Sequence, residues 1–529
     1  MRPTVARTAA VFLGLSLFVT AIVAQEGRVD AITGARLRAH LEFVAHDLLE
    51  GRDTPSRGLD IAANYIATQL KLWGLEPAGD AGTYFQKIVL ERPALDPNGS
   101  TLTYDGKTFA YGDGFVSTTS GGSGEGGLVF VGHGYSIPEL GIDPYAKVEV
   151  RGKILIVLQG MPPGVAFRDI ATRKYPNALR PAEAAEKYGA IGIVQLPTES
   201  NAQNWENLKA QTLRQSGVRM RGSSARPMPT LTLAPALADS LLQGEKSPYS
   251  ELIKVTEPAV EPEPFALTET KRISFRVAVN ANEMTTQNVV AICRGSDPRL
   301  SAEYVAIGAH YDHVGMSSTG DGDRIFNGAD DDGSGTVAVL EMAHAFAVGP
   351  KPKRSILFVW HAGEERGLWG SRYFVDNPTV PIESIVAQLN IDMIGRSKRP
   401  GDENPRNARL TDANSIYIVG SYKLSKDLGD ICKQTNERLY NLNFDYHYDA
   451  PNDPENIYGR SDHYNYALKG IPIAFFFDGV HEDYHRPTDH ADKIDYAKME
   501  KVTRTIYATA FTIATSPTRP RLDGKPGGG

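Results

Sequence analysis

The sequence contains only two cysteines, no block of basic residues and, beyond its first 25 residues, no apolar run long enough to span a bilayer. Cys293 and Cys432 are too few for a disulfide framework or for a zinc site built from thiolates. Lys and Arg total 56 and Asp and Glu total 63, which gives a formal net charge of −7. This balance argues against nucleic acid or an anionic membrane as the main partner.

The beginning of the chain is the exception to this lack of apolar runs. The segment MRPTVARTAAVFLGLSLFVTAIVAQEG places Arg2 and Arg7 before an apolar run, and Ala21 and Ala24 after it. This order is typical of a secretory signal peptide over residues 1–24, and the run is shorter than the roughly 20 residues of a membrane span. An uncleaved anchor stays open as the alternative. We expect a secreted or periplasmic protein with no stable membrane span after removal of the signal.

The length and the hydrophobic content indicate more than one folded unit. A chain of 529 residues exceeds one ordinary domain, and 41% hydrophobic residues are sufficient for real cores. Apolar spacing predicts two helices, in ARLRAHLEFVAHDLLEG and GLDIAANYIATQLKLWG, which both end at glycine. The Pro- and Glu-rich VTEPAVEPEPFALTE indicates a linker. We divide the chain into five parts. A signal (1–24) is followed by an N-terminal segment (25–120) and an insert (121–260). A C-terminal segment (265–515) and a disordered tail (516–529) complete the chain.

The C-terminal segment has the pattern of a mostly parallel sheet. Apolar runs typical of strands occur in NVVAICRG, EYVAIGAHYDH, SILFVWHAGEE, IVAQLNIDMIG and IPIAFFFDG. Helical stretches such as GTVAVLEMAHAFAV lie between them, which predicts an α/β fold with helices on both faces of the sheet. In such sheets, ligands bind beyond the carboxyl ends of the strands.

Histidines and carboxylates follow these predicted strands. They are His310 with Asp312, the pair Glu364 and Glu365, Asp392, His485, and the three aspartates of GADDDGSG, residues 330–332. Mixed nitrogen and oxygen donors suit zinc or another first-row divalent ion. The set exceeds what one tetrahedral ion requires and fits two ions that share a carboxylate.

Each piece of this set also has a simpler explanation when it is taken alone. A single histidine after a strand is usually structural, and GEERG could be an exposed acidic turn. The spacing of an EF-hand is nearly satisfied by Asp330, Asp332, Ser334, Gly335 and Glu341, but SSTGDGDRIFNGA before them is too rich in glycine for the required helix.

The segment HEDYH fits the H-E-x-x-H pattern of zinc proteases, which requires a helix. Gly479 and Pro487 enclose it too closely for two helical turns. The literal motif, with His481 and His485 as ligands and Glu482 as base, is therefore not expected, although metal binding at this segment stays open.

Five motifs in register resemble one known family. GAHYDH, GADDDGSG, AGEERGLWGS, NIDMIG and DYHRPTD are similar to the motifs of the co-catalytic di-zinc aminopeptidases of the secreted bacterial type. This family also includes the glutamate carboxypeptidases. The resemblance covers about residues 30–120 and 265–515. The insert, 121–260, resembles a protease-associated domain, which in this family shapes access to the site.

The resemblance implies a zinc exopeptidase fold, two Zn²⁺ ions per chain and a role for each motif residue. Asp331 would bridge the ions, His310 and Asp392 would complete one site, and Glu365 and His485 the other. The remaining residues would be Glu364 as general base, Asp312 as the carboxylate behind His310, Tyr484 as a donor to the developing oxyanion, Asp489 as a group that orients His485, and His463 as a lining residue.

The implied function is a metallo-aminopeptidase that hydrolyses N-terminal residues from peptide or protein substrates. The alternatives are a carboxypeptidase of the glutamate carboxypeptidase type, for which Arg460 could bind the substrate carboxylate, a glutaminyl-cyclase-like transferase, or a non-catalytic scaffold. The sequence does not give the side-chain preference, the native metal or the oligomeric state.

Overall fold

The computed structural model describes residues 28–171, 174–214, 217–222, 228–254, 261–451 and 453–525. The predicted signal peptide, residues 1–24, lies outside these ranges. The chain divides into two compact units: unit 1 contains Met1–Ile88 and Thr285–Gly529, and unit 2 contains Val89–Met284. Among the described residues, no helix is both long and apolar enough to cross a membrane.

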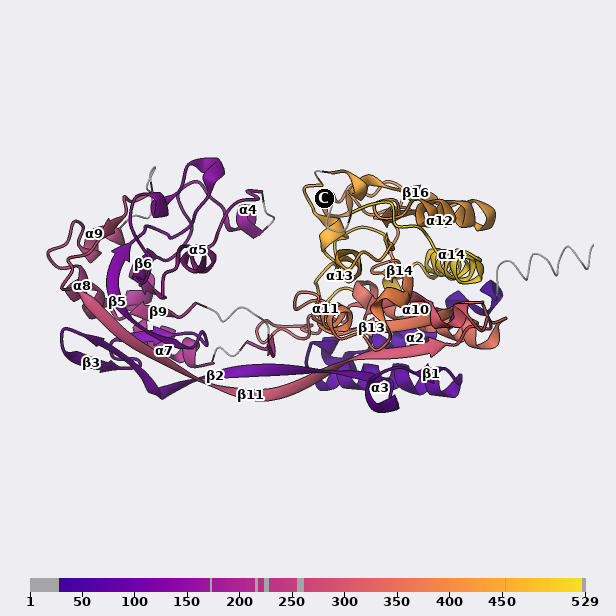
Figure 1. The fold of residues 1–529 in the computed structure, drawn as a ribbon, viewed down its shortest axis with the longest axis horizontal. Coiled ribbons are helices and arrows are strands. Elements are labelled where there is room, and N and C mark those ends of the chain that lie inside the picture. The colour runs from indigo at the N-terminus through magenta and orange to yellow at the C-terminus, as the bar shows by residue number, and fades with distance from the viewer. Residues whose placement is uncertain are drawn as a thin grey trace, which may run out of the picture. The chain divides into compact units, whose positions relative to one another are not determined.

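Unit 1 is built on a mixed sheet whose central strands are parallel (Figure 1). The strand order is β1–β11–β13–β12–β14–β17–β15–β16. The strands β12, β13, β14 and β17 run parallel, whereas β11 and β15 pair antiparallel with their inner neighbours. The bounds are β1 Glu76–Pro77, β11 Arg272–Cys293, β12 Tyr304–His310, β13 Ser355–His361, β14 Ile385–Ile391, β15 Ser415–Val419, β16 Asn443–Asp445 and β17 Ile473–Phe477. The predicted mostly parallel sheet is confirmed.

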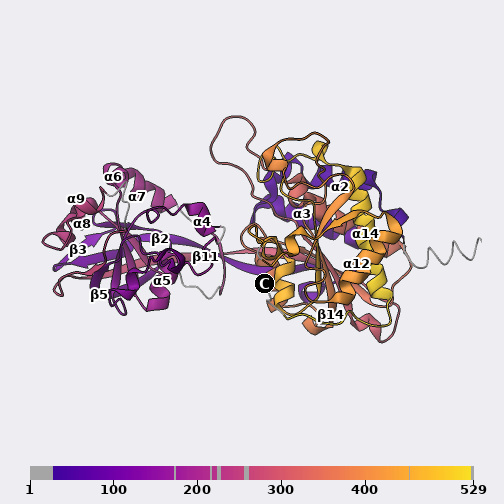
Figure 2. The ribbon, with the colours of Figure 1, turned by 90° about the horizontal axis from the view of Figure 1, so that it is seen from above.

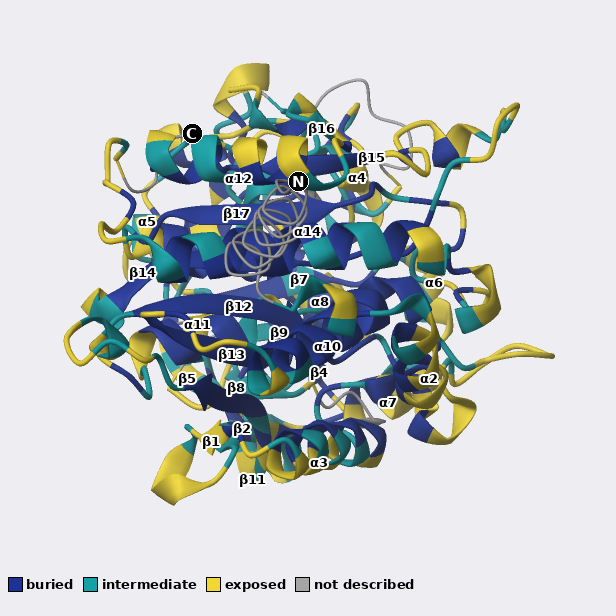
Figure 3. Cartoon of the chain, turned by 90° about the vertical axis from the view of Figure 1, so that its right-hand side faces the viewer, coloured by how far each residue is buried: buried dark blue, intermediate teal, exposed yellow. Residues whose placement is uncertain are grey.

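Helices cover both faces of this sheet. The helices α2, α3, α10, α12 and α14 contribute to one core, and α11 and α13 to another. Along β12, Val305 and Ile307 face the first core, whereas Tyr304 and Ala306 face the second, as the two-residue period of a strand requires. The helix bounds are α2 Gly34–Val44, α3 Arg57–Leu72, α10 Gly335–Val348, α11 Trp369–Asp376, α12 Lys426–Leu439, α13 His463–Leu468 and α14 Tyr496–Thr515. Figure 3 shows the central strands buried between these layers.

The first predicted helix is shorter than its sequence pattern indicates. The helix α2 ends at Val44, and residues 47–52 form a tight turn in which Glu50 and Gly51 have positive φ values. A Cβ atom on Gly51 would lie 2.2 Å from the carbonyl oxygen of Gly315, so only glycine fits this close approach. The turn delivers the next residue, Arg52, into the interior.

Arg52 is fully buried and joins three segments of unit 1. Its guanidinium donates hydrogen bonds to the carbonyl oxygens of Val44, Tyr311, Asn327 and Gly328, at 2.7 to 3.0 Å. Burial lowers the pKa of Arg52 to about 10, so the side chain stays charged at neutral pH. This one cation therefore fixes the loop after β12 and the acidic turn that precedes α10.

Unit 2 has its own sheet and core (Figure 2). The strands β5, β6, β7 and β9 are parallel, and β4, β10 and part of β11 pair antiparallel with the strands at either side. The strand bounds are β2 Phe85–Tyr104, β3 Lys107–Ala110, β4 Phe115–Ser117, β5 Gly122–Phe130, β6 Ile154–Leu158, β7 Gly192–Leu196, β8 Arg219–Met220, β9 Thr230–Leu233 and β10 Phe265–Ala266. The helix bounds are α4 Phe167–Ala171, α5 Pro181–Tyr188, α6 Glu199–Gln203, α7 Trp205–Arg214, α8 Pro235–Leu242 and α9 Tyr249–Leu252. The identity of this insert as a protease-associated domain stays a prediction.

Two further details bear on the sequence analysis. Cys293 and Cys432 are both buried and do not form a disulfide. Part of the segment predicted as a disordered tail makes contacts, since Arg521 forms a two-pronged ion pair with Asp427 on α12 at 2.9 and 3.0 Å.

Replacement of Arg52 tests its role in the fold. We expect Arg52→Met to lower the free energy of unfolding of unit 1 by about 3 kcal/mol or more, because four backbone carbonyls lose a buried, charged donor. Chemical unfolding followed by tryptophan fluorescence measures this change, since Trp73, Trp360 and Trp369 lie in unit 1.

The matched control is Arg366→Met, which removes a pair with Asp53 in which both side chains are partly exposed. That change should cost less than about 1 kcal/mol. Equal losses for the two variants would contradict the role assigned to Arg52.

Candidate metal centre

The predicted ligands meet at the carboxyl edge of the parallel strands. His310 ends β12, Glu364 and Glu365 follow β13 in a turn, and Asp392 follows β14 directly. His485 lies in the loop after β17, and the acidic residues form one wide turn, Ala329–Ser334, before α10. The parallel arrangement explains why segments so far apart in the chain come together here.

The first donor group contains His310, Asp331 and Asp392, all of them buried. His310 Nε2 lies 3.3 Å from Asp331 Oδ1 and 3.6 Å from Asp392 Oδ1. The other ring nitrogen, Nδ1, lies 3.1 Å from the carbonyl oxygen of Asp312, to which it donates when protonated. That tautomer leaves the lone pair of Nε2 directed at the two carboxylates.

The second donor group shares Asp331 with the first. His485 Nε2 lies 3.1 Å from Asp331 Oδ2 and 3.0 Å from Glu365 Oε2. Asp331 thus presents one oxygen to each group, as the predicted bridging residue would. His313 also belongs to this group and was not predicted from the sequence: its Nδ1 lies 2.9 Å from Glu365 Oε1 and 3.7 Å from Asp331 Oδ2.

The donor atoms of both groups fit divalent cations. His310 Nε2, His313 Nδ1, His485 Nε2, Asp331 Oδ2 and Glu365 Oε1 are buried and lack a hydrogen-bond partner. Buried polar atoms without partners are costly, and a cation bound in each group would satisfy them. Imidazole nitrogens with carboxylate oxygens are a donor set that suits zinc.

The charges of the cluster shift its titration. Burial opposes ionisation, but contacts with His310 and His485 hold the pKa of Asp331 well below its usual range. Burial likewise disfavours the charged imidazole, yet Asp331 and Glu365 raise the pKa of His485 to about 10. The carboxylates therefore stabilise positive charge at this position, as a cation site requires.

The three adjacent aspartates have different roles. Only Asp331 faces the donor groups. Asp330 Oδ1 accepts a hydrogen bond from the Gly395 amide at 2.7 Å, and Asp332 Oδ1 accepts from the Met393 amide at 3.1 Å. Asp330 and Asp332 thereby attach the acidic turn to the loop that begins at Asp392. This loop and the one that carries His485 are both constrained, since Met393 and His485 have left-handed φ values of 58° and 53°.

Glu364 is close to the donor groups without belonging to either. Its Oε2 lies 3.9 Å from His310 Nε2, and its amide donates to Asp312 Oδ1 at 3.1 Å. Burial raises the pKa of Glu364 well above its usual value. The charge of Asp392 also raises this pKa, whereas the charge of His310 lowers it. Asp312 therefore connects the imidazole of His310, through its carbonyl oxygen, to the amide of Glu364, through its carboxylate.

Tyr484 stands at the edge of the cluster. Its ring stacks on the imidazole of His485 at a centroid distance of 4.0 Å, and its hydroxyl oxygen accepts a hydrogen bond from Arg460 at 3.2 Å. Burial raises the pKa of Tyr484 well above its usual value, so the phenol keeps its proton.

Two predicted contacts are corrected by the structure. Asp489 holds the acidic turn rather than orienting His485, because its Oδ2 accepts hydrogen bonds from the amides of Asp330 and Asp331 at 2.9 and 3.3 Å. His463 is a core residue rather than a lining residue, since its ring is fully buried, stacks on Phe475 and donates through Nε2 to the Tyr458 carbonyl.

The structure bears on the helix that the H-E-x-x-H pattern of HEDYH requires. No residue of this segment is helical. His481 Nε2 lies 3.2 Å from Asp330 Oδ2, and neither residue belongs to the two donor groups. Glu482 is exposed and contacts Asn404.

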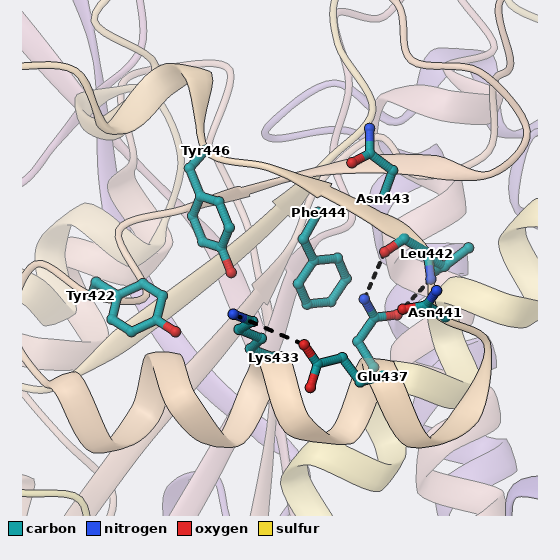
Figure 4. A pocket seen from close by; sticks show the side chains of 9 residues that line it. Tyr422, Lys433, Glu437, Asn441, Leu442, Asn443, Phe444 and Tyr446 are labelled. Atoms are coloured by element: carbon teal, nitrogen blue, oxygen red, sulfur yellow. Dashed lines mark hydrogen bonds and ion pairs between the residues drawn. The ribbon is translucent and has the colours of Figure 1, made fainter.

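A separate cavity lies between α12 and β16 (Figure 4). Its volume is about 440 Å³, and it contains none of the residues of the two donor groups. The lining residues are Tyr422, Lys433, Asn436, Glu437, Asn441, Leu442, Asn443, Phe444 and Tyr446.

All residues of the two donor groups lie within a segment that matches one known protein family. Residues 288–510 match the family described as Peptidase family M28. The probable leucine aminopeptidase of Trichophyton verrucosum (strain HKI 0517) is 29% identical over 227 residues, which are 41% of this chain and 56% of that protein. Leupeptin-inactivating enzyme 1 of Streptomyces exfoliatus is 32% identical over 212 residues, 40% of this chain and 39% of that protein. This chain spans about half the length of the curated relatives it matches.

The structure of an aminopeptidase from Aneurinibacillus sp. strain AM-1 is similar with a TM-score of 0.50 at 19% identity, over 94% of this chain and 97% of that one. At this identity the similarity concerns the fold, and it agrees with the predicted α/β architecture. The resemblance inferred from the five motifs is confirmed.

Removal of the His485 imidazole tests the second donor group. We expect His485→Ala to lower the zinc retained after dialysis by about one ion per chain, because the change deletes a nitrogen donor next to Asp331 and Glu365. Elemental analysis of the dialysed protein measures the retained zinc. Glu482→Gln is the control in the same loop and should retain as much zinc as the wild type; an equal loss in both variants would contradict this ligand assignment.

Proposed function

We propose that this chain, which carries a peptidase family M28 domain over residues 288–510, is a secreted zinc-dependent exopeptidase that removes N-terminal residues from peptides. The observation that carries the proposal is the shared carboxylate of Asp331, whose two oxygens belong to two separate donor groups. The curated relatives named as aminopeptidases support the peptide substrate class.

The proposed centre holds two zinc ions. His310, Asp331 and Asp392 would hold one, and Asp331, Glu365 and His485 the other. Two ions, when bound, lower the pKa of water toward neutrality and polarise the scissile carbonyl group.

The neighbouring side chains supply proton transfer and charge stabilisation. Glu364 lies beside the donor groups without belonging to either, so its carboxyl group can take a proton from water and pass it to the leaving amine. The hydroxyl of Tyr484 accepts from Arg460, which leaves its own proton free for an oxygen that gains negative charge.

The surroundings favour binding of an amine terminus. Glu364 and Asp392 place carboxyl oxygens at the first donor group, and these oxygens could accept hydrogen bonds from a substrate ammonium. One observation favours the alternative, a carboxypeptidase: Arg460 lies beside Tyr484 and could receive a substrate carboxylate. Secretion is proposed from the sequence of residues 1–24.

A panel of blocked and unblocked substrates tests the proposed function. We expect cleavage of leucine para-nitroanilide, no cleavage of its N-acetyl derivative, and loss of activity with 1,10-phenanthroline that added zinc restores. The assay is the absorbance of released nitroaniline. Cleavage of N-blocked peptides at a free carboxyl end instead would replace the aminopeptidase by the carboxypeptidase.

Glu364→Gln is the matched control for the chemistry. It should retain the zinc of the wild type and lower kcat by about 100-fold or more, because the amide cannot accept the proton. Full activity in this variant would contradict the role of Glu364 as general base.

A further inference from the structure

We propose that His313 is a fourth protein ligand of the ion held by Asp331, Glu365 and His485, so that the two metal positions differ in donor number and in affinity. This inference rests on the proposed two-ion centre and adds a ligand that the motif resemblance did not assign. It concerns the loop Tyr311–His313, which directly follows β12.

The position of His313 is fixed from several sides. Its side chain is fully buried, and its amide donates to the carbonyl oxygen of Arg52 at 3.1 Å. Gly328 packs against the imidazole so closely that a Cβ atom there would lie 2.5 Å from His313 Cγ. Arg52 in turn donates to the carbonyl oxygens of Tyr311 and of Gly328, the glycine that packs against the ring. The ring is therefore held in place before any ion binds.

The distance between His313 Nδ1 and Glu365 Oε1 is that expected for two ligands of one ion, and their angles are not those of a hydrogen bond. Nδ1 lies 2.9 Å from Glu365 Oε1, yet neither atom has a hydrogen-bond partner with acceptable angles. Donors bound to one zinc ion at about 2.0–2.1 Å in a tetrahedron lie roughly 3.3 Å apart. The separations of Asp331 Oδ2 and Glu365 Oε2 from His485 Nε2, 3.1 and 3.0 Å, fall in the same range.

The other ring atoms of His313 do not offer a competing role. Nε2 is also buried without a partner. The imidazole meets the ring of His485 edge to face, at a centroid distance of 5.5 Å, so both rings border the same small volume. Among the described residues, His313, Asp331, Glu365 and His485 form one group of potential ligands.

A fourth protein donor makes the two positions unequal. The group with His313 supplies two imidazoles and two carboxylates, whereas the group with His310 supplies one imidazole and two carboxylates. Each additional protein donor strengthens the hold on a zinc ion, and a position with fewer protein donors leaves more room for water or substrate. The ion beside His313 should therefore bind first and leave last. The more open position should belong to the ion beside His310, on the side where Glu364 lies.

The affinities of the two zinc-binding steps, measured on the complete chain, test this inference. Zinc bound at graded free-zinc concentrations should show two unequal steps in the wild type. His313→Asn keeps an amide near the position of Nδ1, which can still hydrogen-bond to Glu365 but ligates zinc poorly. We expect this variant to weaken the tighter step by about tenfold or more, since even indirect partners of metal ligands change affinity 10- to 100-fold.

The control is His344→Asn, which replaces a half-buried histidine of α10 outside both donor groups. Its two binding steps should equal those of the wild type. Unchanged steps in His313→Asn would overturn the inference while leaving the proposed function intact. A wild type that binds fewer than two ions would instead overturn the proposed centre.

A second measurement applies to the wild type and does not depend on the folding of a variant. In the cobalt-substituted protein, each bound histidine contributes one exchangeable imidazole N–H signal with a paramagnetic shift in the proton NMR spectrum. His310, His313 and His485 should give three such signals. Two signals would exclude His313 as a ligand.

Discussion

The two oxygens of Asp331 face different partners, Oδ1 toward His310 and Oδ2 toward His485, and the loops of unit 1 are arranged around this one carboxylate. Ligand bonds to zinc are about 2 Å long and tolerate little displacement. If the acidic turn moved by about 1 Å, one of the two groups would lose its shared donor. The surrounding structure therefore has to hold a buried, charged and irregular turn in place.

That requirement accounts for the polar groups behind the site. Asp489 receives the amides of Asp330 and Asp331, and the side chains of Asp330 and Asp332 receive amides from the loop after Asp392. Arg396 then lies between Asp489 and Asp483, at 3.3 and 2.7 Å. Each buried carboxylate next to Asp331 thus has backbone or cationic partners, and Asp331 is left to face the donor groups. A conservative change at one of these partners would act on the metal through the turn.

The sequence predicted the parts of this site that depend on strand order. His310, Glu365 and Asp392 follow apolar runs, and parallel strands necessarily bring their carboxyl ends to one edge. It did not predict His313, although the residue stands in the quoted motif GAHYDH, because only the loop path set by Arg52 turns its ring into the cluster. A third polar residue immediately after the strand end was the one available signal.

Long-range packing also explains the other differences. The pattern of the first helix continues to Gly51, but the close approach of Gly51 to Gly315 and the burial of Arg52 require a turn there. The role of Asp489 depends on a contact with residues about 160 positions earlier in the chain, which no local pattern contains.

The most direct test of the shared carboxylate is anomalous X-ray diffraction at the zinc edge on crystals of the wild-type chain. We expect two peaks about 3.5–4 Å apart with Asp331 between them, one beside His310 and Asp392 and the other beside Glu365 and His485. A single peak, or peaks that do not contact Asp331, would contradict the account.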